Sequence, residues 1–267
     1  MNLSMTGNLS GITRLAATGI VVAACFALSV STAWGHEVRD LKYGAVLFEF
    51  HQQKYFETLV EHEYAVERGG IDNHGDYPEL LKGGVSLSYG LDRQARDIFS
   101  RLIEENSPIE VRNRAWYYLA KMLYLRGDIE RSAATLGNIN GAMPRDIDQE
   151  YRYLAALVNV RLGYFDKAEA ISHSFEKDGP YAPYLYFNLG VAFGREKDTS
   201  RAVSNLKKAA SYADGSSQLD RLADRSHMAI AYLNGQERDF TGAYDHIRQV
   251  SSTGVYSNRA LLGAGSV

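Results

Sequence analysis

Few of the reactive side chains in this sequence fall at spacings that could support chemistry. His36-Glu37 and His62-Glu63 begin like the helix of a zinc protease, but each lacks a His three residues after the Glu, so no two-histidine face forms to hold a metal. Gly84-Val85-Ser86 lacks the final Gly of a nucleophile elbow, and the Gly-Ala-Gly at 263–265 is followed by no helix for a phosphate loop. We therefore expect no catalysis, metal, cofactor or small-molecule substrate.

Basic and aromatic residues instead recur at positions that a repeated helix would turn toward one face. These positions are Lys82, Tyr89, Arg114, Tyr117, Lys121, Tyr124, Tyr153, Arg161, Phe187, Asn188 and Arg195. Lys and Arg pair with carboxylates and aromatic rings cover apolar side chains, so this lining favours an extended segment of a protein or peptide partner. The alternative is that these are ordinary exposed and packing residues, and both interpretations remain open.

The elements that must position these residues are helix pairs, because small and apolar types return about every 34 to 36 residues. In the clearest repeat the first face is formed at i, i+3, i+4 and i+7 by Tyr186, Leu189, Gly190 and Phe193. The matching second face is formed by Ala202, Leu206 and Ala209. The small residue on each helix lets two backbones approach to roughly 8 to 10 Å.

The repeat can be followed along most of the chain. Its starts are Tyr77, Asn113, Gln149, Pro183 and Leu222, which are 36, 36, 34 and 39 residues apart. A weaker opening repeat uses Leu41, Gly44, Ala45 and Phe48 as its first face, followed by residues 55–66. A further first helix begins at Tyr256, so we expect six repeats and a fragment over residues 36–267.

Residues that favour turns lie between the predicted helices. Gly90-Leu91-Asp92, Gly127-Asp128 and Gly163-Tyr164-Phe165-Asp166 join the two helices of a pair, since Gly suits a left-handed helix end and Asp caps the next helix. Pro108, Pro144 and Pro180 are expected to close the second helices.

The faces from Tyr186 to Ala209, and those between Trp116 and Pro144, resemble the tetratricopeptide repeat (TPR) pattern. The resemblance implies an all-α, right-handed superhelical solenoid of antiparallel helix pairs, whose first helices line a concave groove for peptides or protein surfaces. Arg152 and Arg225 are departures from the apolar first face.

The N-terminus predicts export. Arg14 precedes a charge-free, largely apolar run at 15–30, and small residues at 31–35 offer cleavage positions, so residues 1–35 are expected to be a signal peptide of a periplasmic protein. Alternatively, residues 22–25 resemble a lipobox that would make Cys25 a lipid anchor, although the apolar run continues past it. An uncleaved anchor is a third possibility, but sixteen residues are short for a membrane span.

Composition and resemblance together favour a protein scaffold. The formal net charge of −3 provides no basic stripe for nucleic acid. We expect a non-catalytic adaptor of the bacterial cell envelope, similar to TPR proteins of outer-membrane assembly or exopolysaccharide export. The alternative is the helical domain of an envelope enzyme such as a lytic transglycosylase, because the last repeat lacks its second helix and suggests a truncated form of a longer protein.

Overall fold

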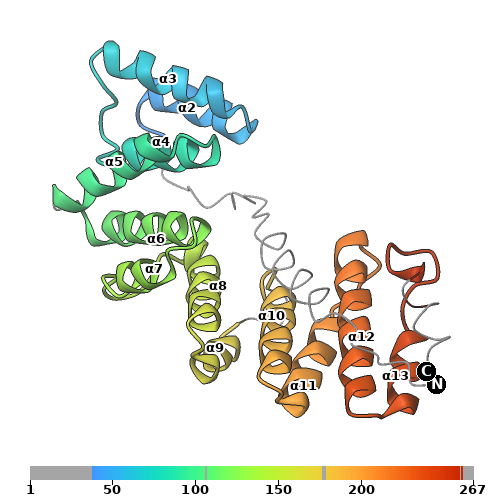
Figure 1. Cartoon of the computed structure of the whole chain (residues 1–267). Helices are drawn as coiled ribbons and strands as arrows, with labels where there is room; N and C mark the ends of the chain where they lie inside the picture. The colour runs from blue at the N-terminus through green and yellow to red at the C-terminus, as the bar shows by residue number, and fades with distance from the viewer. Residues whose placement is uncertain (1–37, 106, 176–178, 259, 261–267) are drawn as a thin grey trace. The chain divides into compact units, whose positions relative to one another are not determined.

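The computed structural model describes residues 38–105, 107–175, 179–258 and 260, and within these ranges it contains helices and no β-strand (Figure 1). The expectation of an all-α protein is therefore confirmed. The expected signal peptide with Cys25, the dipeptide at 36–37 and the closing stretch 261–267 lie outside the described residues. No helix in the described part is both long enough and apolar enough to span a membrane.

The described chain divides into two compact units at the turn between Leu162 and Gly163. The helices of the N-terminal unit are α2 (Leu41–His51), α3 (Tyr55–Glu67), α4 (Tyr77–Ser88), α5 (Asp92–Glu104), α6 (Ile109–Leu125), α7 (Ile129–Leu136) and α8 (Arg145–Arg161). Those of the C-terminal unit are α9 (Phe165–Ser172), α10 (Ala182–Arg195), α11 (Thr199–Ala210), α12 (Ser217–Gln236) and α13 (Phe240–Ile247).

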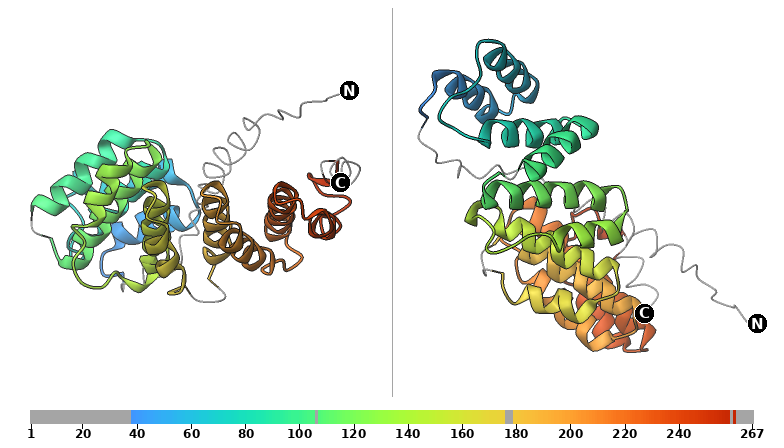
Figure 2. Two further views of the ribbon diagram at one scale, coloured as in Figure 1. Left: turned by 60° about the horizontal axis from the view of Figure 1, so that its bottom comes forward. Right: turned by 90° about the vertical axis from the view of Figure 1, so that its left-hand side faces the viewer.

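Within each unit, every helix packs against the helix that follows it, so the chain forms a succession of hairpins (Figures 1 and 2). The helices that open successive hairpins also contact one another: α6 contacts both α4 and α8, and α10 contacts α12. These are the first helices of the repeat. A core cluster in the N-terminal unit joins α4, α5 and α6 through Leu80, Ala95, Ile98, Phe99, Leu102, Val111, Ala115 and Met122.

The small residues of the repeat mark the places where backbones come close. Ala202 and Ala209 are buried on α11, and α11 packs against α10. A Cβ added to Gly190 would lie 2.6 Å from Cγ of Leu206 and 3.0 Å from the carbonyl oxygen of Ala202. Only a residue without a side chain fits there.

The glycines of the hairpin turns adopt the expected left-handed conformation, with φ of 84° at Gly90, 81° at Gly127 and 79° at Gly163. Because glycine has no Cβ, it adopts this positive φ at a helix end with little conformational strain. The turn that precedes α11 achieves the same geometry with Lys197, at φ 63°.

Aspartate caps three of the second helices. The side chains of Asp128, Asp198 and Asp239 each accept a hydrogen bond from the backbone N–H three residues later. The expectation for the other two turns is wrong: Asp92 and Asp166 lie inside the first turn of their helices. Each carboxylate forms an ion pair with an arginine instead. Arg126 Nη2 lies 2.8 Å from Asp92, and Arg201 Nη1 lies 2.7 Å from Asp166.

Pro108 and Pro144 act at the opposite end of the helix from the one expected. α7 ends at Leu136, well before Pro144, and Pro144 is the N-cap of α8. Pro108 is likewise the N-cap of α6. With a fixed φ and no N–H to leave unpaired, proline is well suited to start the next helix.

The opening repeat has a different register from the one expected. Leu41, Ala45 and Phe48 are exposed, and the buried face of α2 consists of Tyr43, Val46, Leu47 and Phe50. Both stripes are apolar and have helical spacing, so the pattern alone could not choose between them. The first helices α6, α8 and α12 also begin four or five residues before the starts inferred from the repeat.

Candidate partner-binding faces

In the N-terminal unit, three of the expected lining residues of α6, Arg114, Tyr117 and Lys121, contact acidic side chains of the next first helix. The guanidinium of Arg114 binds both carboxylate oxygens of Asp146 on α8, at 2.7 and 2.6 Å. The two side chains are 9% and 11% exposed, so the pair is largely shielded from solvent. It fixes α6 against α8.

A second polar cluster lies one turn further along the same helices. The hydroxyl of Tyr117 donates to Glu150 at 2.8 Å, and Lys121 Nζ lies 4.0 Å from the same carboxylate and 5.8 Å from the centre of the Tyr117 ring. Burial lowers the pKa of Lys121, and Glu150 opposes that effect. These buried contacts join α6 to α8.

Arg114, Tyr117 and Lys121 are therefore buried connections between successive repeats. A Lys121→Glu exchange would place a second carboxylate beside Glu150, so loss of partner binding in such a variant would report misfolding as much as recognition. Substitutions that test partner binding to this face must therefore be made at exposed residues.

Near the end of this face, Tyr153 is buried and Arg161 is exposed. Tyr124 is also buried, which raises the pKa of its hydroxyl, while the positive charge of Arg161 acts in the opposite direction. Arg161 is thus the accessible cation of this group.

Of the other two expected residues of this unit, Lys82 lies on α4 and Tyr89 is its C-cap. Lys82 Nζ is 2.6 Å from Glu63 on α3, whereas the ring of Tyr89 is 52% exposed. Tyr89 contacts the exposed ring of Phe56 on α3 with 6.2 Å between centroids, and Val60 lies exposed one turn beyond Phe56. Phe56 and Val60 were missed from sequence because they lie on a second helix; the i, i+4 apolar spacing was the available signal.

In the C-terminal unit, Phe187 and Asn188 of α10 are buried and Arg195 is exposed. Phe187 is covered by the guanidinium of Arg225 from α12, with Cζ 4.6 Å from the ring centre. Arg225 had appeared only as a departure from the apolar first face. On α12 its charge lies over an aromatic ring, which is a favourable place for a cation.

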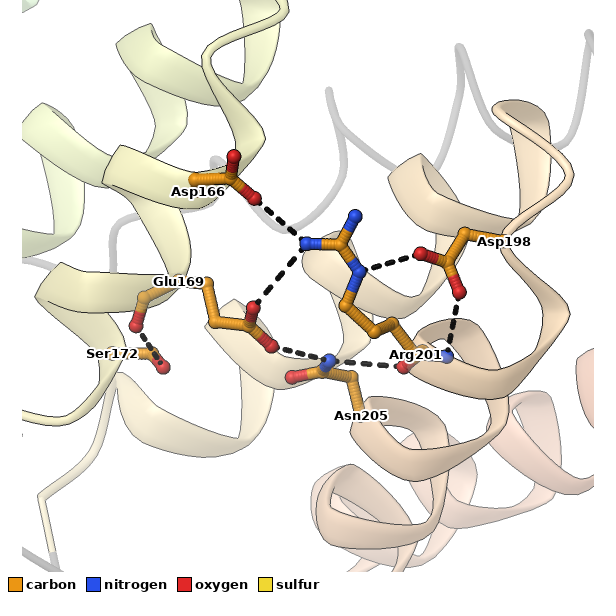
Figure 3. A network of polar contacts seen from close by, with 6 residues as sticks. All are labelled: Asp166, Glu169, Ser172, Asp198, Arg201 and Asn205. Carbon is orange, nitrogen blue, oxygen red and sulfur yellow. Dashed lines mark hydrogen bonds and ion pairs between the residues drawn. The ribbon is translucent and has the colours of Figure 1, made fainter.

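A separate ionic network joins the second helices α9 and α11 (Figure 3). Arg201 Nη1 lies 2.7 Å from Asp166 and 3.7 Å from Glu169, while its Nε lies 2.5 Å from Asp198. Asn205 donates to Glu169 at 3.3 Å. Because Arg201 already has three carboxylate partners, this network connects repeats and leaves little positive charge for a ligand.

The described residues contain no cluster of three His, Cys, Asp or Glu side chains that could hold a metal ion. His62 is buried and does not face a second histidine; its Nε2 lies 3.5 Å from Glu79. An open hollow of about 760 Å³ runs along α5 and includes the exposed Arg93 and Arg96. Its other cations, Lys82, Arg101 and Arg126, have carboxylate partners.

No protein-family model matches the sequence, and no curated protein matches it. Among solved structures, the chain is similar to PilW, a type IV pilus biogenesis factor, with 14% identity, a TM-score of 0.58, and coverage of 83% of this chain and 97% of that one. It is also similar to BtubC from P. vanneervenii, with 13% identity, a TM-score of 0.53, and coverage of 85% and 90%. At these identities the likeness concerns the fold.

Proposed function

From the premise that this chain has a TPR-like helical-repeat fold, we propose that it is a non-catalytic scaffold of the bacterial cell envelope that holds a segment of a partner protein along the faces of its first helices. The observation that carries the proposal is the row of contacting first helices in each unit, together with the aromatic and basic side chains on them. In the C-terminal unit Arg225 of α12 lies over Phe187 of α10, and in the N-terminal unit the exposed Tyr89 at the end of α4 lies beside Phe56 of the second helix α3. Repeat proteins use such continuous faces for binding.

The exposed members of the lining define the accessible part of this face. In the N-terminal unit they are Tyr89, with Phe56 and Val60 beside it, and Arg161. Aromatic rings with a polar edge are common anchors in protein interfaces. The envelope assignment comes from the expected signal peptide at 1–35, and the role of PilW in pilus biogenesis is compatible with it.

The binding proposal is tested by in-cell crosslinking and mass spectrometry with the double variant Tyr89→Glu/Phe56→Glu. Both rings are more than half exposed, so the helices should fold while the apolar patch is lost. Partners crosslinked to the wild-type chain should disappear with this variant. The matched control is Tyr164→Glu, an equally exposed tyrosine at the turn before α9. An unchanged set of partners in the double variant would reject the role of this face.

The envelope proposal is tested separately by cell fractionation and by measuring the mass of the mature chain. Cleavage near residue 35 in a periplasmic fraction is the expected result. A lipidated residue Cys25 in the membrane fraction supports the lipoprotein alternative, and an unprocessed cytoplasmic chain contradicts both.

A further inference from the structure

The first helices of the C-terminal unit bring two arginines of α12 near two aromatic residues of α10. Arg225 Cζ lies 4.6 Å from the ring centre of Phe187. Arg221, one turn earlier on α12, is close enough to Tyr184 that its charge affects the pKa of the hydroxyl, which burial raises and Arg221 lowers. We name this group, Tyr184, Phe187, Arg221 and Arg225, the arginine–aromatic face.

Neither arginine forms an ion pair with a carboxylate in the described part of the chain. Arg221 is exposed and Arg225 is partly exposed. A guanidinium that covers a ring with its flat side keeps its N–H groups directed outward at the edge, where they can bind a carboxylate through two parallel hydrogen bonds.

The corresponding face of the N-terminal unit is built differently. There the cations of α6, Arg114 and Lys121, meet Asp146 and Glu150 on the next first helix. The first helices of the N-terminal unit therefore supply carboxylates to their own cations, whereas Arg221 and Arg225 on α12 form no ion pair with any described residue. Two neighbouring arginines that form no ion pair with a described residue, in a chain with a formal net charge of −3, favour the approach of an external anion.

We propose that the arginine–aromatic face binds an acidic segment of a partner protein. Arg221 and Arg225 are four residues apart on α12, which separates them by about 6 Å along the helix axis. Carboxylates at alternate positions of an extended chain are about 6.6 to 6.8 Å apart. An extended segment with the pattern acidic, any residue, acidic therefore places one carboxylate on each arginine.

The bound segment would also contact an aromatic side chain of α10. Phe187 is almost completely covered, so it serves as the platform for Arg225, whereas Tyr184 on the preceding turn of α10 is partly exposed. A side chain next to the acidic pair can lie against the Tyr184 ring. This inference rests on the proposed scaffold function and specifies the chemistry of the partner.

The probe for a binding test is a fluorescein-labelled ten-residue peptide of alternating Glu and Val, measured by fluorescence anisotropy on the full chain. A matched peptide with Gln in place of Glu is the uncharged control. The wild-type protein should bind the Glu peptide at least tenfold more tightly than the Gln peptide. This preference should weaken as salt rises from 50 to about 300 mM, because the Debye length shortens.

Variants then locate the site. Arg221→Glu/Arg225→Glu should lower the affinity for the Glu peptide at least tenfold, and the milder Arg221→Gln/Arg225→Gln should lower it with an unchanged circular dichroism spectrum. The charge-matched control is Arg93→Glu/Arg96→Glu on α5, two exposed arginines that form no ion pair with a described residue, which should bind within twofold of wild type.

Three results would overturn the inference: no preference for the Glu peptide, wild-type affinity in the α12 variants, or loss of binding only in the α5 control. The crosslinking test with Tyr89 and Phe56 is independent of these measurements. If it succeeds while the peptide test fails, the scaffold proposal stands and the acidic partner class is wrong.

Discussion

At the scale of single residues, the Arg114–Asp146 pair shows how strongly one contact can constrain a repeat. Both charges are removed from solvent, and each satisfies the other through two hydrogen bonds. Removing one partner leaves the other as an unpaired, nearly buried charge. Replacing both by apolar groups avoids that cost.

We therefore expect Arg114→Met to lower the free energy of unfolding by about 3 kcal/mol, and Arg114→Met/Asp146→Leu to regain most of this loss. Urea denaturation followed by circular dichroism measures both. The control is Arg131→Met, since Arg131 pairs with Asp128 at an exposed site and should contribute less than about 1 kcal/mol. Equal losses in Arg114→Met and the double variant would contradict the explanation.

Gly190 permits a second prediction at this scale. The added Cβ of Gly190→Ala would meet Leu206 and the backbone of Ala202, so unfolding free energy should fall by about 1 to 3 kcal/mol. Gly84→Ala is the matched control, because Gly84 is also helical and has open space around it. There alanine should stabilise by about 0.5 to 1 kcal/mol. Thermal or urea midpoints that move in the same direction for both variants would exclude this reason.

At the scale of helices, α12 and α13 are joined by a histidine pair. The Nδ1 atoms of His227 and His246 lie 3.1 Å apart, a distance at which one nitrogen must donate a proton and the other accept it. Burial lowers the pKa of both rings. Each is further lowered by a nearby positive charge, His246 for His227 and Lys207 for His246, while Asp224 and Asp245 oppose the shifts.

This pair predicts a loss of stability in acid. Because the folded pKa values are lowered, the unfolded chain binds more protons below the ordinary histidine pKa of about 6.5, so stability falls as pH falls from there. Each excess proton contributes up to about 1.4 kcal/mol per pH unit. His246→Gln should flatten the dependence of the urea midpoint between pH 7.5 and 5, and His173→Gln at an exposed site is the control. An unchanged slope in His246→Gln would contradict the role of the pair.

At the scale of the molecule, the packing within each unit is local. The substantial contacts join helices that follow one another or are two apart in sequence. In such repeats, stability is close to a sum of contributions from neighbouring elements, so damage in one place need not spread. The N-terminal and C-terminal units should therefore respond separately to a local change.

Hydrogen exchange measures this response. Gly190→Ala should increase exchange in α10, α11 and α12, and leave α2 to α5 at wild-type rates, since its clash lies between α10 and α11. Arg114→Met should instead increase exchange in α6 and α8 and leave the helices of the C-terminal unit at wild-type rates. A uniform increase over the whole chain in either variant would indicate a single cooperative unit.

The sequence by itself determined the features that depend on neighbours along the chain. Helix pairs, glycine turns at Gly90, Gly127 and Gly163 and the cap at Asp128 follow from local backbone preferences and from the period of small residues. Close packing at Gly190 follows from the same period.

Only the tertiary structure decided which side chains meet. Arg114 and Asp146 are 32 residues apart and Tyr117 and Glu150 are 33 apart, so their contacts depend on the register between helices. The exposed stripe of α2 and the place of Arg225 over Phe187 were also decided there. A periodic pattern records which residues share a face, whereas packing sets which face meets which partner and which charges are left for another molecule.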